Sequence, residues 1–173
     1  MNPDLEGIRM LLTDVDGVLT DGRIHFDPSS MLETKAFHVH DAAGLVYWHR
    51  SGRMSGFLSG RSCAVVEARA REIGVTEVCL GHLAKGPVLD EILAKHGLQP
   101  HEVAYVGDDI LDLPVLRRVG FAAAPADARP EIREVVDHVC VAPGGFGAVR
   151  EVIEVLMKAQ GTWGDVLESQ GLA

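Results

Sequence analysis

The chain has 173 residues, of which 47% are apolar, and its formal net charge is −9. This length suits one domain, 1–173, with a hydrophobic core, and the apolar content argues against intrinsic disorder. The acidic balance argues against broad binding to nucleic acid or anionic lipid, so a phosphorylated ligand would need a local positive site.

The elements that the sequence predicts begin with an apolar run at 8–13, which indicates a buried strand leading to Asp14. Two extended segments on either side of the turn residues 27–30 predict a hairpin over 23–37. A helix is expected at 42–49. Strands and helices then alternate, with strands at 53–58, 77–80, 103–106, 121–124 and 138–141 and helices at 63–73, 87–96, 111–119, from Pro130 and at 147–158.

This alternation predicts an α/β fold of the Rossmann type, a three-layer sandwich with a central parallel sheet between helices. Sites in such sheets lie at the carboxyl ends of the strands. The C-terminal tail, 159–173, is expected to be poorly ordered after Gly161 in a lone subunit.

The three cysteines, Cys63, Cys79 and Cys140, are widely spaced and predict neither a disulfide framework nor a zinc site. The first residues lack the basic and apolar regions of a signal peptide, and no uncharged apolar run approaches the ~20 residues of a membrane helix. We therefore expect a cytoplasmic protein that has no membrane partner.

Two groups of carboxylates follow predicted strands. Asp14 and Asp16 come directly after the strand at 8–13, and Gly17 lets the chain turn sharply there. The second group follows the strand at 103–106 and opens a helix; it consists of Asp108, Asp109 and Asp112. Both groups should therefore lie at the same edge of the sheet.

So many carboxylates repel each other and stay ionised only where a cation holds them together. Oxygen ligands without convergent Cys or His favour Mg²⁺ over zinc. A carboxylate beside Mg²⁺ can attack phosphorus and form an acyl phosphate, while a second carboxyl group can protonate the leaving oxygen. Alone, each group could be a turn or a helix N-cap. Together they favour a magnesium-dependent phosphoryl-transfer site.

Two further features could bind a phosphate. Ser59-Gly60-Arg61 follows the strand at 53–58, and its hydroxyl, its N–H groups and the next helix N-terminus predict an anion-binding loop. Lys85 lies in a predicted loop before a helix, between the serine loop and the second acidic group. A lone lysine is usually a solvated charge, but one in this place can neutralise both the attacking carboxylate and the phosphoryl oxygens.

These features occur in the order of the four motifs of the haloacid dehalogenase superfamily of phosphotransferases, which the chain resembles over nearly its whole length. The motif residues are Asp14-x-Asp16, Ser59, Lys85 and Gly107-Asp108-Asp109-x-x-Asp112. The resemblance implies that Asp14 is the nucleophile and Asp16 the general acid/base. It also implies that Asp14, Asp108 and the backbone carbonyl of Asp16 hold Mg²⁺. The resemblance also implies that Ser59 and Lys85 bind the phosphoryl group. Asp109 and Asp112 would lie behind the metal ligands and orient them.

Within this superfamily the chain resembles the capless 3-deoxy-D-manno-octulosonate 8-phosphate phosphatases. The segments that carry this likeness are 16–22, the hairpin, Lys35-Ala36-Phe37, Ser59-Gly60-Arg61 and 144–151. The resemblance implies a homotetramer in which four hairpins form a central barrel and a neighbour's C-terminal tail covers the substrate. It further implies substrate contacts from His38, His40, Asp41, Gly60, Arg61 and Arg69. Alternation places His38 and His40 on one face of a strand.

The identity of the sugar is left open. This chain has Asp41-Ala42-Ala43-Gly44 where the octulosonate enzymes usually have Asp-Gly-x-Gly, and small residues there also occur in relatives that act on nine-carbon sugar acids. Those relatives tend to carry glutamate at the position of Arg61, which this chain retains. A receiver-like module that is phosphorylated without rapid turnover, or a regulatory protein with weak activity, is a further alternative. A receiver would not need Asp16.

Overall fold

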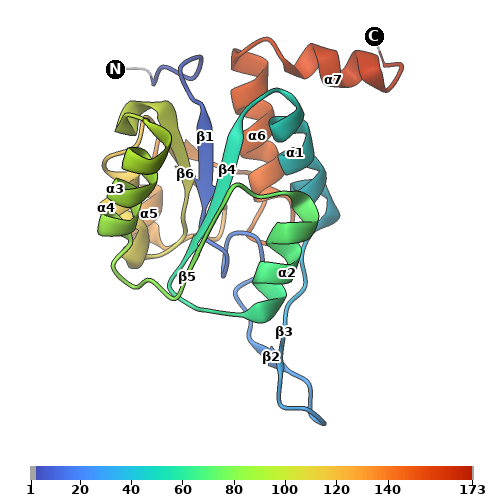
Figure 1. Cartoon of the computed structure of the whole chain (residues 1–173), viewed down its shortest axis with the longest axis vertical. Helices are drawn as coiled ribbons and strands as arrows, with labels where there is room; N and C mark the ends of the chain where they lie inside the picture. The colour runs from blue at the N-terminus through green and yellow to red at the C-terminus, as the bar shows by residue number, and fades with distance from the viewer. Residues whose placement is uncertain (1–2, 173) are drawn as a thin grey trace.

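The computed structural model describes residues 3–172 and has a parallel six-stranded sheet at its centre (Figure 1). The strand order is β5-β4-β1-β6-β7-β8. The strands are β1 (Met10–Thr13), β4 (Met54–Ser59), β5 (Glu77–Leu80), β6 (Val103–Val106), β7 (Phe121–Ala124) and β8 (His138–Val139). The predicted α/β fold with a central parallel sheet is therefore confirmed.

Helices cover both faces of the sheet. On one face lie α3 (Lys85–His96), α4 (Leu113–Leu116) and α5 (Pro130–Arg133), and on the other α1 (Val39–Arg50), α2 (Ala64–Ile73) and α6 (Ala148–Ala159) (Figure 1). Alternate residues of β1 serve the two cores: Leu11 packs with the α1, α2 and α6 side, whereas Met10 and Leu12 pack with the α3, α4 and α5 side. Both faces of the strand are buried, which is the reason that its first three residues are all apolar.

A hairpin between β1 and α1 projects away from the sheet (Figure 1). Its antiparallel strands, β2 (His25–Phe26) and β3 (Glu33–Thr34), are shorter than predicted. The carboxylate of Asp27 holds the turn by accepting from the N–H groups of Ser29 and Ser30 at 3.0 and 2.8 Å. Such short strands give the hairpin little support of its own.

Helix α1 begins earlier than predicted, and this overturns one expectation. His38 caps the helix, its Nδ1 accepting from the N–H of His40 at 3.3 Å, and Asp41 lies in the first turn. The expected strand face for His38 and His40 is wrong because alternation over two residues cannot outweigh an acidic first turn and a capping side chain. Lys85 likewise is the first residue of α3 rather than part of a loop.

Three other segments differ from the predictions or complete them. The predicted helix at 111–119 is the 3₁₀ turn η2 (Ile110–Asp112) followed by α4, and a further 3₁₀ turn, η1 (Pro100–Glu102), precedes β6. The tail, expected to be poorly ordered after Gly161, instead forms α7 (Trp163–Ser169); residue 173 of that tail lies outside the described residues. No described helix combines the length and apolar character needed to span a membrane.

Candidate active site

The site lies at the carboxyl edge of the sheet, where β1 and β6 are neighbours. Thr13 and Val106, the last residues of these strands, are register partners. The N–H of Asp14 continues the pairing by donating to the carbonyl of Val106 at 2.9 Å. The chain runs from β1 to β4 and β5 on one side and returns to β6 on the other, so this edge is the switch point of the topology.

Three carboxylates converge at this edge. Ligand oxygens of Asp14, Asp108 and Asp112 all lie within 4.8 Å of one another. Two glycines make room for them: a Cβ on Gly17, whose φ is +87°, would collide with the Asp108 carboxylate, and a Cβ on Gly107 would lie 2.6 Å from the Cβ of Asp112. The glycines of both sequence motifs thus permit the close approach of the acids.

Lys85 is the cation within this group, and its side chain is only 1% exposed. Its Nζ lies 3.0 Å from Oδ2 of Asp14 and 2.6 Å from Oδ1 of Asp112. Tyr105, which sequence reasoning missed, accepts from Nζ at 3.1 Å and donates its hydroxyl to Asp112 Oδ1 at 2.5 Å. Burial first, and the nearby carboxylates second, raise the pKa of Tyr105, so its phenol remains a proton donor.

Both carboxylate oxygens of Asp112 already accept hydrogen bonds from the protein, so Asp112 is poorly placed to be a metal ligand. Its Oδ2 accepts from the N–H groups of Asp108 and Asp109 at 2.9 and 3.2 Å, while Oδ1 faces Lys85 and Tyr105. The fully buried Asp112 therefore fixes both the Asp108 loop and the ammonium group. Asp109 caps η2, its side chain accepting from Ile110 N–H at 2.7 Å.

The negative charge of the group exceeds what Lys85 can balance. Burial raises the pKa of Asp14 to about 6, an increase that Lys85 partly opposes and Asp112 reinforces. Burial, and then repulsion from Asp14, Asp112 and Asp109, raises the pKa of Asp108 to about 8. Carboxylates so disfavoured as anions fit a bound divalent cation, and an all-oxygen donor set suits a hard one such as Mg²⁺.

Above these carboxylates is an open cavity of about 200 Å³. Ser59 contributes a buried hydroxyl from the end of β4, and its Oγ accepts from the N–H of Arg61 at 3.1 Å. The residues that line the cavity are Asp14, Asp16, Ser59, Gly60, Arg61, Leu83, Lys85, Asp108, Asp109 and Leu111. The structure therefore brings together residues from all four sequence motifs.

Two charged residues of the hairpin, Glu33 and Lys35, extend the site and were not predicted to belong to it. Lys35 Nζ contacts Asp16 Oδ1 and lies 2.7 Å from Glu33 Oε1. Arg61 Nη2 lies 2.9 Å from Glu33 Oε2, and Arg61 Nε lies 3.7 Å from Asp16 Oδ2. We call this closed ring of two acids and two bases the rim network. Only the alternation of charge in Glu33-x-Lys35 could have indicated it.

The other predicted substrate contacts lie apart from this cavity. His38, Asp41 and Arg69 line a narrow hollow beside Phe37, between α1 and α2, and His40 is exposed on the first turn of α1. Asp41 accepts from the N–H of Arg150 at 2.8 Å and so caps α6, and burial raises its pKa. Arg69 pairs with Glu72 at 2.7 Å. Their substrate contacts stay predictions.

A second group of ligand-type side chains, His138, Cys140 and Glu151, is less suited to a metal. The Glu151 oxygens accept from the N–H groups of Val141 and Ala142 at 3.0 to 3.1 Å. Burial raises the pKa of the Cys140 thiol to about 12, so the thiolate that metals bind is disfavoured. This group is better explained as a structural contact that joins β8 to α6, with His138 Nε2 3.1 Å from Glu151 Oε1.

Comparison with known proteins agrees with the fold and with the family resemblance of the sequence. The family model for haloacid dehalogenase-like hydrolases matches residues 60–153. The 3-deoxy-D-manno-octulosonate 8-phosphate phosphatase of Escherichia coli K12 is 41% identical over 156 residues, which are 90% of this chain and 82% of that protein. The chain therefore belongs to the haloacid dehalogenase-like hydrolases.

Two solved structures are similar over almost the whole chain, and both are octulosonate 8-phosphate phosphatases. The enzyme from Moraxella catarrhalis, in complex with magnesium, phosphate and KDO, has a TM-score of 0.93 and 36% identity, covering 95% of this chain and 94% of that one. The cobalt-bound enzyme from Haemophilus influenzae has a TM-score of 0.86 and 37% identity, covering 91% of each chain.

Proposed function

We propose that this chain is a Mg²⁺-dependent phosphatase that hydrolyses 3-deoxy-D-manno-octulosonate 8-phosphate through an aspartyl-phosphate intermediate on Asp14. One observation carries the proposal: the Asp14 carboxylate lines a cavity, 3.0 Å from Lys85 and in a group with Asp108. The relatives with 36 to 41% identity support the choice of substrate, since they are named for this ester.

Asp14, Asp108 and the backbone carbonyl of Asp16 would hold the Mg²⁺ ion. When bound, the ion supplies positive charge to the phosphoryl oxygens and removes the repulsion between the two carboxylates. Asp112 would act from behind, because its oxygens are already engaged by Lys85, Tyr105 and backbone N–H groups.

In the first half-reaction a carboxylate oxygen of Asp14 attacks phosphorus, and the bond between phosphorus and the sugar oxygen breaks. Lys85 stabilises both the attacking carboxylate and the charge on the phosphoryl group. Ser59 and the N–H groups of the serine loop bind the remaining phosphoryl oxygens. The side chain of Lys85 is only 1% exposed, so solvent screens its charge little.

Asp16 supplies and removes the proton. Its carboxyl group lines the cavity and gives a proton to the departing sugar oxygen, which leaves as an alcohol. Water then attacks phosphorus, Asp16 takes the proton from that water, and the acyl phosphate separates into inorganic phosphate and free Asp14. A receiver-like module has no need of this second carboxyl group, so Asp16 favours turnover over a phosphorylation switch.

Arg61 would recognise the acidic end of the sugar. Its side chain is 48% exposed at the cavity wall, and its guanidinium group is shared with Glu33. An arginine in this place suits a carboxylate partner, because its planar group can donate two parallel hydrogen bonds.

The test is phosphate release from a panel of eight-carbon, nine-carbon and smaller sugar acid phosphates in the presence of Mg²⁺. We expect the highest kcat/KM for the eight-carbon ester. A higher value for the nine-carbon ester would transfer the assignment to nine-carbon sugar acids while leaving the chemistry intact. Absence of phosphate release from every ester, with the fold retained, would contradict the proposed activity.

We further propose that the chain acts as a cytoplasmic homotetramer assembled through the hairpin. Phe26, Met31 and Leu32 at the hairpin are 56%, 70% and 68% exposed, a concentration of apolar surface that favours burial against another copy. Cys63, Cys79 and Cys140 are free thiols, which agrees with a reducing compartment. The oligomeric state can be measured by light scattering.

A further inference from the structure

The rim network joins the hairpin to both loops that carry the proposed chemistry. Lys35 belongs to the hairpin segment, Asp16 to the loop after β1, and Arg61 to the loop after β4. Each acid contacts both bases, so the four charges close a ring with no net charge. The charges of the ring therefore balance without a metal ion.

Lys35 is the most buried member of this ring. Its side chain is 1% exposed, whereas Asp16, Glu33 and Arg61 are 18%, 15% and 48% exposed. An ammonium group withdrawn from water needs charged partners at close range, and Lys35 has two. Its position is therefore determined by the two carboxylates rather than by solvent.

Lys35 acts from outside the cavity. Among the described residues that line the cavity are Asp16 and Arg61, but neither Lys35 nor Glu33. Lys35 contacts Oδ1 of Asp16, which leaves Oδ2 on the side of Arg61 and the cavity wall. Oδ1 is thus occupied by the ammonium group of Lys35, and Oδ2 is the oxygen left available to a bound phosphate ester.

We propose that Lys35 is a positioning residue for Asp16: it holds one carboxyl oxygen so that the other faces the leaving-group oxygen of the substrate. This inference rests on the proposed function, because it concerns the proton that Asp16 exchanges in that reaction. Lys35 itself touches no reacting atom. Misplacement of an acid/base group by about 1 Å can cost ~10²-fold in rate, so holding one carboxyl orientation has a measurable consequence.

A purely structural role for Lys35 would be to fasten the hairpin. Glu33 separates the two roles, because it also anchors the hairpin, through both Lys35 and Arg61, yet it does not contact Asp16 in the ring. Glu33→Gln weakens the fastening but leaves Lys35 paired with Asp16. Lys35→Met removes both functions.

The experiment compares two leaving groups. Octulosonate 8-phosphate releases an alkoxide that must be protonated, whereas 4-nitrophenyl phosphate releases a phenolate that is stable without a proton. Lys35→Met should lower kcat for the sugar ester by ~10²-fold and for the aryl ester by less than ~3-fold. Glu33→Gln should keep the ratio of the two rates within ~3-fold of the wild-type value. If Lys35→Met does not fold, Lys35→Gln serves as the neutral variant, with the same direction expected.

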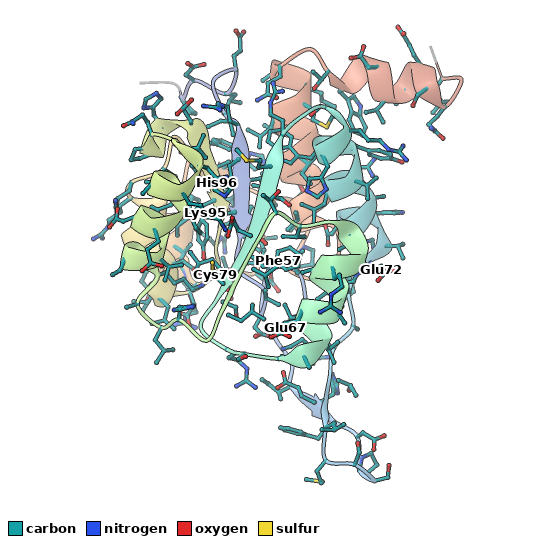
Figure 2. The ribbon with its side chains drawn as sticks, in the orientation of Figure 1. Phe57, Glu67, Glu72, Cys79, Lys95 and His96 are labelled. Carbon is teal, nitrogen blue, oxygen red and sulfur yellow. The ribbon has the colours of Figure 1, made fainter. Side chains whose placement is uncertain are left out.

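Lys95→Met is the matched control. Lys95 also pairs with a glutamate, Glu77 at 2.7 Å, but this pair lies at the opposite, amino edge of the sheet, and Figure 2 shows Lys95 on α3, away from the hairpin. We expect both rates to be unchanged. Equal losses on the two esters in Lys35→Met, or a shift of the ratio in Glu33→Gln as large as in Lys35→Met, would overturn the positioning role.

Failure of the proposed substrate gives a different result. A wild-type chain that is inactive on the octulosonate ester but hydrolyses other alkyl phosphates would refute only that substrate. The ratio between one of those alkyl esters and 4-nitrophenyl phosphate would then decide the role of Lys35 in the same way.

Discussion

Two charged groups of the site differ in how their charges balance. One, which we call the floor, consists of Asp14, Asp108, Asp112 and Lys85, and the other is the rim network. The floor holds three carboxylates, those of Asp14, Asp108 and Asp112, against one ammonium group, that of Lys85. The rim network holds two acids and two bases. The floor therefore has excess negative charge that a cation can neutralise, whereas the charges of the rim network balance without one. This difference supports our two proposals, that the floor binds Mg²⁺ and that the rim network orients Asp16.

The largest expected effect is on activity at the floor. Asp14→Asn should reduce Mg²⁺-dependent phosphate release by ~10⁴-fold or more, because an amide cannot form the acyl phosphate. Asp90→Asn is the control, since Asp90 is an exposed carboxylate whose partner is Arg118 on the protein surface. Substantial turnover in Asp14→Asn would remove the nucleophile from the mechanism and with it the functional meaning of the floor.

Loss of the single floor cation should strongly destabilise the fold. Lys85→Met leaves Asp14 and the buried Asp112 without their shared ammonium group, and breaking a buried ion pair from one side costs about 3 to 5 kcal/mol. Urea denaturation of the metal-free variant measures this change. A loss below about 1 kcal/mol would mean that the floor does not depend on Lys85 for its charge balance.

The excess acid at the floor should make the metal-free chain less stable as the pH rises. The pKa of Asp108 is raised from 3.8 to about 8, so between these values the folded state binds more protons than the unfolded state, and the free energy of unfolding falls with increasing pH. After allowance for solvent screening we expect a decrease on the order of 2 kcal/mol between pH 4 and pH 8 from this group.

Asp108→Asn sharpens that measurement. The amide carries no charge, so the pH dependence should flatten and the metal-free variant should be more stable than the wild type at pH 8. Added Mg²⁺ should raise the unfolding temperature of the wild type and have little effect on the variant. An unchanged pH slope in Asp108→Asn would show that the floor carries no such electrostatic strain.

The smallest effect on the fold is expected at the hairpin. Replacing Phe26 and Leu32 by serine should change the free energy of unfolding of the monomer by no more than about 0.5 kcal/mol, since both side chains are largely exposed. The same change should disrupt the proposed tetramer, which light scattering measures. Val141→Ser, which alters an apolar side chain that is 89% exposed elsewhere, should leave the assembly intact. A monomeric wild type would contradict the proposed role of the hairpin.

Much of the fold could be predicted because local signals agreed with one another. The strands at 77–80, 103–106 and 121–124 have the predicted bounds, since short apolar runs ended by glycine, proline or acidic residues leave few alternatives. The residues of the four motifs could also be placed at one edge, because parallel strands end together. Helix starts were predicted less accurately. Helix α1 begins at Val39, after the capping side chain of His38, and α3 begins at Lys85, whose side chain pairs with Asp14 and Asp112.

The sequence alone thus determined the parallel sheet, the acidic edge and the order of the motif residues, because strand periodicity and turn chemistry act over a few neighbouring residues. Only the tertiary structure decided that Tyr105 and Asp112 contact Lys85, that Asp41 caps α6, and that Lys35 contacts Asp16. These contacts join residues up to 109 positions apart. Their geometry follows from how the sheet, the helices and the hairpin pack, and no local pattern in the chain specifies it.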